Sequence, residues 1–199
     1  SRLSRGLPSV DLGRIGLAVS PIDPDVVYAI LEAADNEGGF FRSTDRGESW
    51  EKRSDHSTPS LYYAEIFADP HRFDRVYSMD VRLAVTDDGG ASFRPLGGSN
   101  KHVDDHVIWV DPARRDHYLV GGDGGLYESS DGAASWRFFA NLPVTQFYKV
   151  AVDDSRPFYR VYGGTQDNFT LGGPSRTLTT EGILNSDWEL LTDGDGFQP

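Results

Sequence analysis

Carboxylate, amide and imidazole side chains gather in three short stretches of the chain that do not repeat. The stretches hold Asp104, Asp105 and His106, then Asp123, and then Gln166, Asp167 and Asn168. Glycoside hydrolysis needs two carboxyl groups on either side of the scissile bond, one as acid and the other as base or nucleophile. The catalytic candidates are therefore Asp104, Asp105 and Asp167, and the best pair joins Asp167 to one of the other two.

The same kinds of side chain can bind a ligand without reacting with it. The ligand-binding candidates are Arg14, His106, Asp123, Gln166, Asp167 and Asn168. Asp123 lies in a Gly-Asp-Gly-Gly run, where a tight turn is the alternative explanation because Asp is a turn former. His106 could act as a general base or a metal ligand, but a lone histidine at a strand entry is more often simply hydrogen-bonded. The sequence leaves these alternatives open.

The sequence predicts no cofactor and no metal site. It contains no cysteine, and the histidines other than His106 lie apart from one another in loops. Asp193-Gly194-Asp195-Gly196 resembles the opening of a calcium-binding loop, but the distal Glu of such a loop would lie beyond Pro199. Calcium at Asp193 and Asp195 is therefore the alternative to our expectation of no cofactor.

A short signature occurs three times, and each copy begins 43 residues after the one before it. The copies are Ser43–Trp50, Thr86–Phe93 and Ser129–Trp136. A period of about 40–50 residues, with short Val-, Ile-, Tyr- and Phe-rich runs between Gly, Asp and Pro, is typical of a β-propeller. We expect an all-β fold, a β-propeller of four-stranded antiparallel blades with about four blades present.

The repeats divide the chain into blades at about residues 13–54, 61–97, 105–141 and 146–192, with a fifth starting at 193–199. Together they form one domain that covers residues 1–199. A blade buries both faces only against its neighbours, so an open array exposes apolar surface. We therefore expect part of a larger propeller, closed by the rest of a longer chain or by further subunits. A closed four-bladed ring is the alternative.

The signature residues have structural roles in the predicted hairpins. The Asp accepts backbone N–H bonds across the turn, the Gly adopts a positive φ, and the aromatic residue packs between sheets. The residues assigned to folding are Asp45, Trp50, Asp88, Phe93, Asp131 and Trp136. In the third copy Ala133 stands where the others have Gly, which predicts backbone strain or a different turn.

Strand direction places the candidate site residues and the signatures at opposite ends of the sheets. If the first strand of each blade runs downward, the connections between blades lie on top, as do those between second and third strands. Every signature then lies beneath. The non-repeating polar residues fall almost entirely in the top connections. Polar residues that differ between blades are better site candidates than residues that repeat.

The 199 residues include 31 acidic and 19 basic side chains, which gives a formal net charge of −12. Binding to nucleic acid or to an anionic membrane needs a basic surface, so both functions are disfavoured. No apolar run approaches the roughly 18–20 residues of a membrane span, and no signal peptide is visible. We expect no nucleic-acid partner and no direct insertion into a membrane.

The signature resembles the Asp-box, or BNR repeat, of sialidase-like, sortilin-type (VPS10) and xyloglucanase-like propellers. Other stretches resemble a bacterial branch of BNR-repeat or sortilin-like glycosyl-hydrolase-type proteins, namely 13–16, 104–109, 122–125, 146–148 and 162–168. That branch is generally large and exported, so the resemblance implies an extracellular or periplasmic location. It covers essentially the whole chain, but the same propeller hosts both enzymes and receptors.

The expected function is that of a binding module whose top-face loops recognise a protein, a peptide or a glycan. The alternatives are a glycoside hydrolase with paired top-face aspartates and a structural subunit of a surface assembly. A sialidase would need an arginine cluster, and only Arg14 and Arg82 fall on the expected top face. The sequence leans away from an enzyme, and glycoside hydrolase is the enzyme class that fits best.

Overall fold

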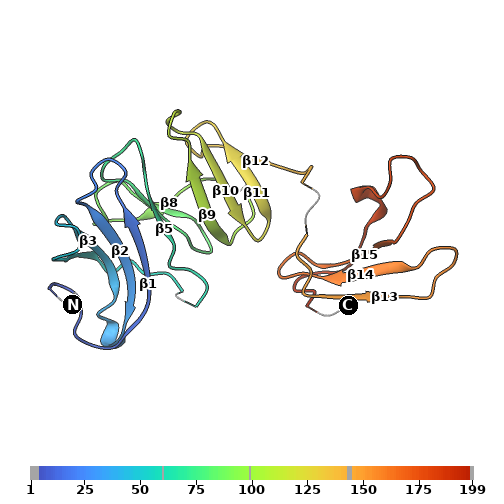
Figure 1. Ribbon diagram of the computed structural model, residues 1–199, viewed down its shortest axis with the longest axis horizontal. Coiled ribbons are helices and arrows are strands. Elements are labelled where there is room, and N and C mark those ends of the chain that lie inside the picture. Colours follow the sequence, from blue (N-terminus) through green and yellow to red (C-terminus); the bar gives the residue numbers. More distant parts are fainter. Residues whose placement is uncertain (1–4, 60, 99, 143–144, 198–199) are drawn as a thin grey trace. The chain divides into compact units, whose positions relative to one another are not determined.

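The computed structural model describes residues 5–59, 61–98, 100–142 and 145–197, so the end of the expected fifth blade, residues 198–199, lies outside the described residues. Four four-stranded antiparallel sheets are present, each with its strands in sequence order (Figure 1). The only helical segments described are two 3-10 turns, η1 (Ala34–Asn36) and η2 (Asn185–Asp187). Neither has the length or apolar character to cross a membrane. The predicted all-β architecture of four-stranded blades is confirmed.

The chain forms two compact units, residues 1–139 and 140–199. Three sheets make up the first unit. They are β1 (Leu12–Val19), β2 (Val27–Ala33), β3 (Gly39–Ser43) and β4 (Glu51–Ser54); β5 (Ile66–Ala68), β6 (Val76–Ser78), β7 (Ala84–Thr86) and β8 (Arg94–Pro95); and β9 (Asp105–Val110), β10 (Tyr118–Gly122), β11 (Gly125–Ser129) and β12 (Arg137–Phe138). The second unit holds β13 (Lys149–Val152), β14 (Arg160–Gly164), β15 (Thr170–Pro174) and β16 (Glu189–Thr192).

The Val-, Ile-, Tyr- and Phe-rich runs of the sequence predict inner strands close to the observed ones. They also predict outer strands over 92–96 and 135–139, and the observed β8 and β12 are shorter. Ser92 and Ser135 belong instead to the signature turns, where their hydroxyls donate to Asp88 and Asp131 at 2.6 Å. A residue whose backbone and side chain are both held in a turn cannot also pair in a ladder. The signature therefore delays the start of each outer strand.

Two apolar clusters join the three sheets of the first unit. The cluster between the first and second sheets contains Val26, Tyr28, Ile30, Phe40, Ala64, Ile66 and Val76. The cluster between the second and third contains Tyr77, Met79, Leu83, Val85, Leu96, Ile108, Tyr118, Val120, Ala133 and Trp136. Successive side chains of a strand point to opposite faces, so each inner strand contributes every second residue to a cluster.

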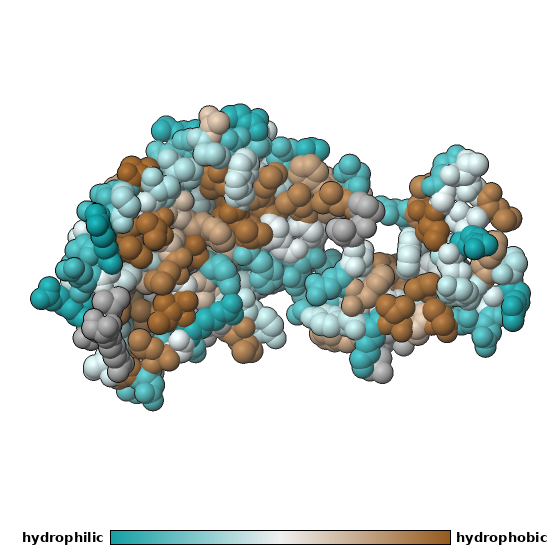
Figure 2. All heavy atoms as spheres, in the orientation of Figure 1, coloured by the Kyte–Doolittle hydropathy of each residue, from teal (hydrophilic) through white to brown (hydrophobic). Residues whose placement is uncertain are grey.

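The other face of β1 leaves an apolar row exposed. Ile15, Leu17 and Val19 are 46%, 61% and 58% exposed, at positions that alternate with Gly16 and Ala18. Figure 2 shows apolar side chains gathered on the surface of the first unit. Such a row offers a surface that a further sheet would bury favourably. Membership of a closed ring stays a prediction.

The three signature hairpins share one hydrogen-bond pattern. In the first, Asp45 accepts the backbone N–H of Ser49 at 2.8 Å and the Ser49 hydroxyl at 2.5 Å. The Ser43 hydroxyl donates to Asp45 at 2.7 Å and accepts the N–H of Gly47 at 2.8 Å. The other two copies repeat these bonds. The hydrogen bonds from Ser49 and Ser43 lower the pKa of Asp45 to about 2, so this carboxylate serves the turn.

Ala133 adopts the same turn as the glycines of the other copies. Its φ is 73°, beside 89° at Gly47 and 93° at Gly90. Its N–H donates to the Ser129 hydroxyl at 2.9 Å, as the N–H of Gly47 does to Ser43. A left-handed backbone costs a residue with a Cβ about 1–2 kcal/mol. Of the two outcomes that the sequence predicts, the structure has the strained residue and not a different turn.

Each signature hairpin is also joined to the turn between the first two strands of its own sheet. The fourth residue of the signature donates its backbone N–H to a carbonyl of that turn. The three bonds join Arg46 to Asp25 at 2.9 Å, Gly89 to Asp74 at 2.9 Å and Gly132 to Asp116 at 3.0 Å. One end of every sheet in the first unit is thus closed by the same backbone frame.

Candidate functional site

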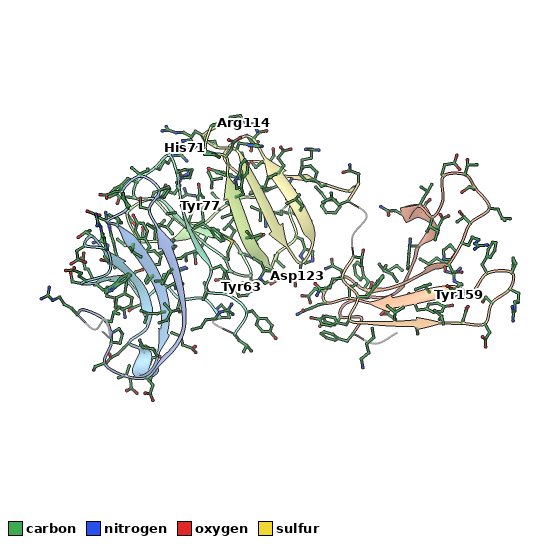
Figure 3. All side chains as sticks on the ribbon, viewed as in Figure 1. Tyr63, His71, Tyr77, Arg114, Asp123 and Tyr159 are labelled. Carbon is green, nitrogen blue, oxygen red and sulfur yellow. The ribbon has the colours of Figure 1, made fainter. Side chains whose placement is uncertain are left out.

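The other end of the first unit consists of connections that differ from sheet to sheet. We call this end the loop rim and define it by residues 34–38, 55–59, 61–65, 79–83, 96–98, 100–104 and 123–124. In Figure 3, Tyr63 and Asp123 lie at the loop rim, and His71 and Arg114 lie at the opposite end. The arrangement follows from antiparallel strands, because alternate connections must lie at alternate ends of a sheet.

Four side chains of the loop rim and the adjoining strand form a connected network. The Tyr63 hydroxyl donates to Asp104 at 2.6 Å, and the Tyr63 ring stacks on His106 with the centroids 5.2 Å apart. His106 Nε2 lies 3.0 Å from Asp123 Oδ1. One carboxylate oxygen of Asp104 lies within 4.8 Å of one of Asp123. Two carboxylates, a phenol and an imidazole therefore converge where the second and third sheets meet.

The backbone fixes the two carboxylates relative to each other. Asp104 has a φ of 65°, and its N–H donates to the carbonyl of Val81 at 2.9 Å. Its own carbonyl accepts the N–H of Asp123 at 3.1 Å. A Cβ on Gly122 would lie 2.2 Å from that carbonyl, so this close approach requires glycine. The connection before β9 and the turn after β10 are thus bound together.

Burial and neighbouring charge shape the protonation of this end. Burial, then the hydrogen bond to Asp104, raises the pKa of the Tyr63 hydroxyl, so the phenol stays a donor at neutral pH. Burial raises the pKa of Asp80, and the negative charge of Asp104 acts in the same direction. The Asp80 carboxylate accepts the N–H of Val81 at 2.7 Å, which opposes the rise. Carboxylates are crowded here, which favours a positively charged partner.

Asp105, a catalytic candidate from the sequence, is buried and paired with Lys101. The two side chains are 4% and 6% exposed. The second carboxylate oxygen accepts the N–H of Leu83 at 3.2 Å, and the Lys101 ammonium also donates to the carbonyl of His102 at 3.0 Å. A carboxylate with both oxygens occupied in the protein interior is not placed to meet a ligand at the surface. Through the hydrogen bond from Leu83, the Asp105 carboxylate also joins the second sheet to the third.

Arg14 lines a cavity of about 570 Å³ at the loop rim, on the side of the first sheet. Its guanidinium donates to Glu65 at 2.8 Å and to the carbonyl of Leu61 at 3.3 Å. The remaining wall consists of Ile30, Leu31, Glu32, Ala33, Asn36, Gly38, Asp55, Ser57, Thr58, Pro59 and Ala64. Residues 55–59 and 61–64 therefore contribute to both the cavity and the network.

In the second unit, Gln166, Asp167 and Asn168 form the turn between β14 and β15. Gln166 Oε1 accepts the Tyr148 hydroxyl at 2.5 Å, and Asn168 Nδ2 donates to the Gln166 carbonyl at 3.1 Å. Asp167 has a φ of 57°, and its N–H donates to Asp195 at 2.9 Å. These residues contribute to the local structure of the turn. Their ligand-binding role, the catalytic role of Asp167 and the calcium alternative stay predictions.

The loop rim combines residues that the sequence singled out with others that it did not. Asp104, His106 and Asp123 come together, whereas Asp105 points into the interior. The sequence also predicts a strand over residues 62–68, in which the aromatic Tyr63 suggests only a core position. The observed strand β5 begins at Ile66, so Tyr63 belongs to a loop. A shorter strand prediction there would have placed Tyr63 among the candidates.

His56 predicts a pH dependence of stability. Its ring stacks on Phe93 with the centroids 3.7 Å apart, its Nε2 lies 3.0 Å from the Ser78 hydroxyl, and burial lowers its pKa to about 4. An unfolded histidine has a pKa of about 6.5. His56 therefore contributes stability that is complete above pH 6.5 and is lost as the pH falls toward 4.

Allowing for solvent screening, we expect this loss to be about 1–2 kcal/mol. Urea unfolding between pH 7 and 4 should show it, and His56→Gln should reduce the difference between the two pH values by that amount. Carboxylates elsewhere in the chain titrate over the same pH range, but they change the stability of the wild type and of the variant equally. An identical pH dependence in the variant would contradict the prediction.

Comparisons with known proteins identify the fold and no family. No protein-family model matches the chain. No curated protein matches it either. Among solved structures, the GH74 enzyme of Niastella koreensis is similar with a TM-score of 0.51 and 12% identity over 80% of this chain and 28% of that chain. The GH74 xyloglucanase of Xanthomonas campestris is similar with a TM-score of 0.49 and 19% identity, over 91% of this chain and 32% of that chain. YCF48 of Cyanidioschyzon merolae is similar with a TM-score of 0.49 and 14% identity, over 94% of this chain and 58% of that chain.

These likenesses concern the architecture alone, because every identity is below 20%. The chain spans about a third or less of the length of the two GH74 enzymes. Together with the four-stranded sheets, the likeness to the Niastella enzyme shows that the chain has the fold of a partial β-propeller.

Proposed function

We propose that the protein is a binding module and that its loop rim is the binding face for a peptide or a glycan. One observation carries the proposal. The network of Tyr63, Asp104, His106 and Asp123 joins polar side chains from two sheets at one end of the unit, beside an open cavity. Polar groups that converge beside a cavity are typical of ligand sites.

The distribution of polar groups between the two ends supports this proposal. At the end opposite to the loop rim, each signature carboxylate accepts several hydrogen bonds within its own hairpin. The side chain of Asp123 at the loop rim is 22% exposed, and that of His106 at the adjoining start of β9 is 40% exposed. Asp123 and His106 therefore retain surface through which a ligand can be bound, in addition to their bond to each other.

A binding assay with two matched double variants tests the proposal. The probes are an immobilised panel of cello- and xylo-oligosaccharides and a random-sequence peptide library. Asp104→Asn with Asp123→Asn should weaken binding of the retained probe at least about tenfold. The control, Glu48→Gln with Asp154→Asn, removes two exposed charges that are not among the residues that define the loop rim, and it should bind as the wild type does. A panel with no retained probe, or equal binding by both variants, contradicts the proposal.

Glycoside hydrolysis is the second candidate, because it uses a pair of carboxyl groups and such a pair is present. Oxygens of Asp104 and Asp123 lie within 4.8 Å of each other, which is closer than the about 5–5.5 Å between the carboxyl groups of retaining glycosidases. If the pair is catalytic, each of Asp104→Asn and Asp123→Asn should abolish the release of reducing sugar from a β-glucan panel. Release that is unchanged in both variants would exclude this pair from catalysis.

A further inference from the structure

The cavity beside Arg14 has an apolar floor and a polar mouth. Ile30, Leu31 and Ala64 are 2%, 3% and 6% exposed and form part of its wall, together with Ala33 and Pro59. Glu32 and Asp55 line it as well and are exposed. Its volume of about 570 Å³ is that of a pocket that accepts a small molecule or a long side chain.

Negative charge predominates around the mouth. Arg14 is the one basic residue among the described residues that line the cavity, and its guanidinium is paired with Glu65. Lys52 pairs with Asp55 at 2.7 Å, but the Asp55 side chain is 92% exposed and a carboxylate has about four acceptor positions. The loop that supplies Asn36 and Gly38 also carries Asp35 and Glu37, both exposed. Five carboxylates therefore surround the mouth with only two basic groups, Arg14 and Lys52. The carboxylates are those of Glu32, Asp35, Glu37, Asp55 and Glu65. The formal net charge of the whole chain is −12.

One wall group has a hydrogen bond still to make. Thr58 Oγ1 is buried and has no hydrogen-bond partner within the described residues. This oxygen exposes almost no surface, so the missing hydrogen bond is a local free-energy cost of the wall and not a contact for a ligand. The cavity therefore combines an apolar floor with an acidic mouth.

A side chain with a long apolar stem and a cationic head matches the apolar floor and the acidic mouth. Lysine and arginine lay their methylene stems along apolar surface and keep the charged head near solvent or carboxylates. The described residues that line the cavity include no aromatic ring on which the apolar face of a sugar could stack. We infer that the cavity receives a lysine or arginine side chain of a peptide bound at the loop rim. The inference rests on the proposed binding function and names its ligand class.

Labelled peptides that differ in one residue type test the inference. The probes are three fluorescein-labelled octapeptides of Gly, Ser and Ala that carry Lys, Gln or Glu at the same two positions. Fluorescence anisotropy with the full chain should show the Lys peptide binding at least about tenfold more tightly than the Gln peptide, with no binding of the Glu peptide. Raising the salt from about 25 to about 300 mM should weaken the Lys peptide most.

Two variants locate the site. Glu32→Gln with Asp55→Asn removes carboxylates at the mouth and should weaken the Lys peptide about tenfold, whereas the charge-matched Glu48→Gln with Asp154→Asn should not. Ser57→Trp should block the cavity by bulk alone, because Ser57 is exposed on its wall. Circular dichroism of each variant verifies that the sheets are intact.

The outcomes separate this inference from the proposed function. Equal binding of the three peptides, or Lys-peptide binding that both cavity variants leave unchanged, overturns the inference. A probe that is sensitive to Asp104→Asn with Asp123→Asn but insensitive to both cavity variants also overturns it, while the loop rim remains a binding face. A neutral oligosaccharide that Ser57→Trp displaces would assign the cavity to a glycan and overturn it as well.

Discussion

Asp105→Ala should lower the free energy of unfolding by about 3–5 kcal/mol, because it leaves the Lys101 ammonium buried without its counter-charge. The Lys101 side chain is 6% exposed, so water cannot replace the lost carboxylate. The N–H of Leu83 would lose its acceptor at the same time. Urea unfolding followed by circular dichroism measures the change, which is a large part of the stability of an ordinary domain.

A double variant distinguishes a lost charge pair from a general loss of packing. Lys101→Met with Asp105→Asn removes both charges and keeps an acceptor for Leu83, so it should recover most of the stability. If Asp105→Ala also loses ligand binding and the double variant regains it, the loss of binding is a result of lower stability and not of a missing catalytic or binding group. If Asp105→Ala instead unfolds as the wild type does, the buried pair does not hold the second and third sheets together, and Asp105 returns to the list of catalytic candidates.

Gly90→Ala should cost about 3–4 kcal/mol. A Cβ at this position would lie 2.1 Å from Cδ1 and 2.3 Å from Cε1 of Phe40, which is itself fully buried. Overpacking a core costs about 1–3 kcal/mol. The φ of 93° adds the cost of a left-handed backbone, about 1–2 kcal/mol. Thermal and urea unfolding should both record the loss.

Ala133→Gly at the equivalent position of the third copy is the matched control. Relief of the left-handed strain favours the glycine, whereas a more flexible unfolded chain and the loss of a buried methyl group oppose it. These effects nearly cancel, so we expect a change of less than about 1 kcal/mol. If Gly90→Ala proves as mild as this control, the Phe40 ring moves aside and the close packing at the second hairpin is not required for stability.

The fold could be predicted from the sequence because the signature of one blade occurs in it three times. The 43-residue period and the signature hairpins determine the sheets, and they also sort the connections into two ends. Where a signature residue serves the turn, as Ser92 and Ser135 do, propensity alone makes the neighbouring strand too long. Side-chain hydrogen bonds of the turn prevail over β-propensity there.

The candidate site could be predicted only in part, because its residues do not repeat. The position of Asp104 and Asp123 in loops, and of His106 at the start of β9, follows from strand direction. Asp105 can be buried because its charge is neutralised by Lys101, four residues earlier, whose side chain is buried beside it. That pairing is visible only in the three-dimensional structure. Adjacent residues in a strand point to opposite faces, so Asp105 and His106 separate although the sequence groups them. Periodicity alone cannot tell which of the two faces the solvent.

The equivalent backbone bonds that close one end of each sheet in the first unit have a consequence for how such a protein can diversify. The three shared backbone bonds involve no residue of the loop rim, so insertions and exchanges there should leave this frame intact as long as the packing of His56 on Phe93 and the bond of Asn100 to Trp136 are kept. Selection for a new partner can then act on the loop rim while the signature end maintains the fold. Loop-rim segments exchanged with those of a related protein should therefore leave the folded structure intact.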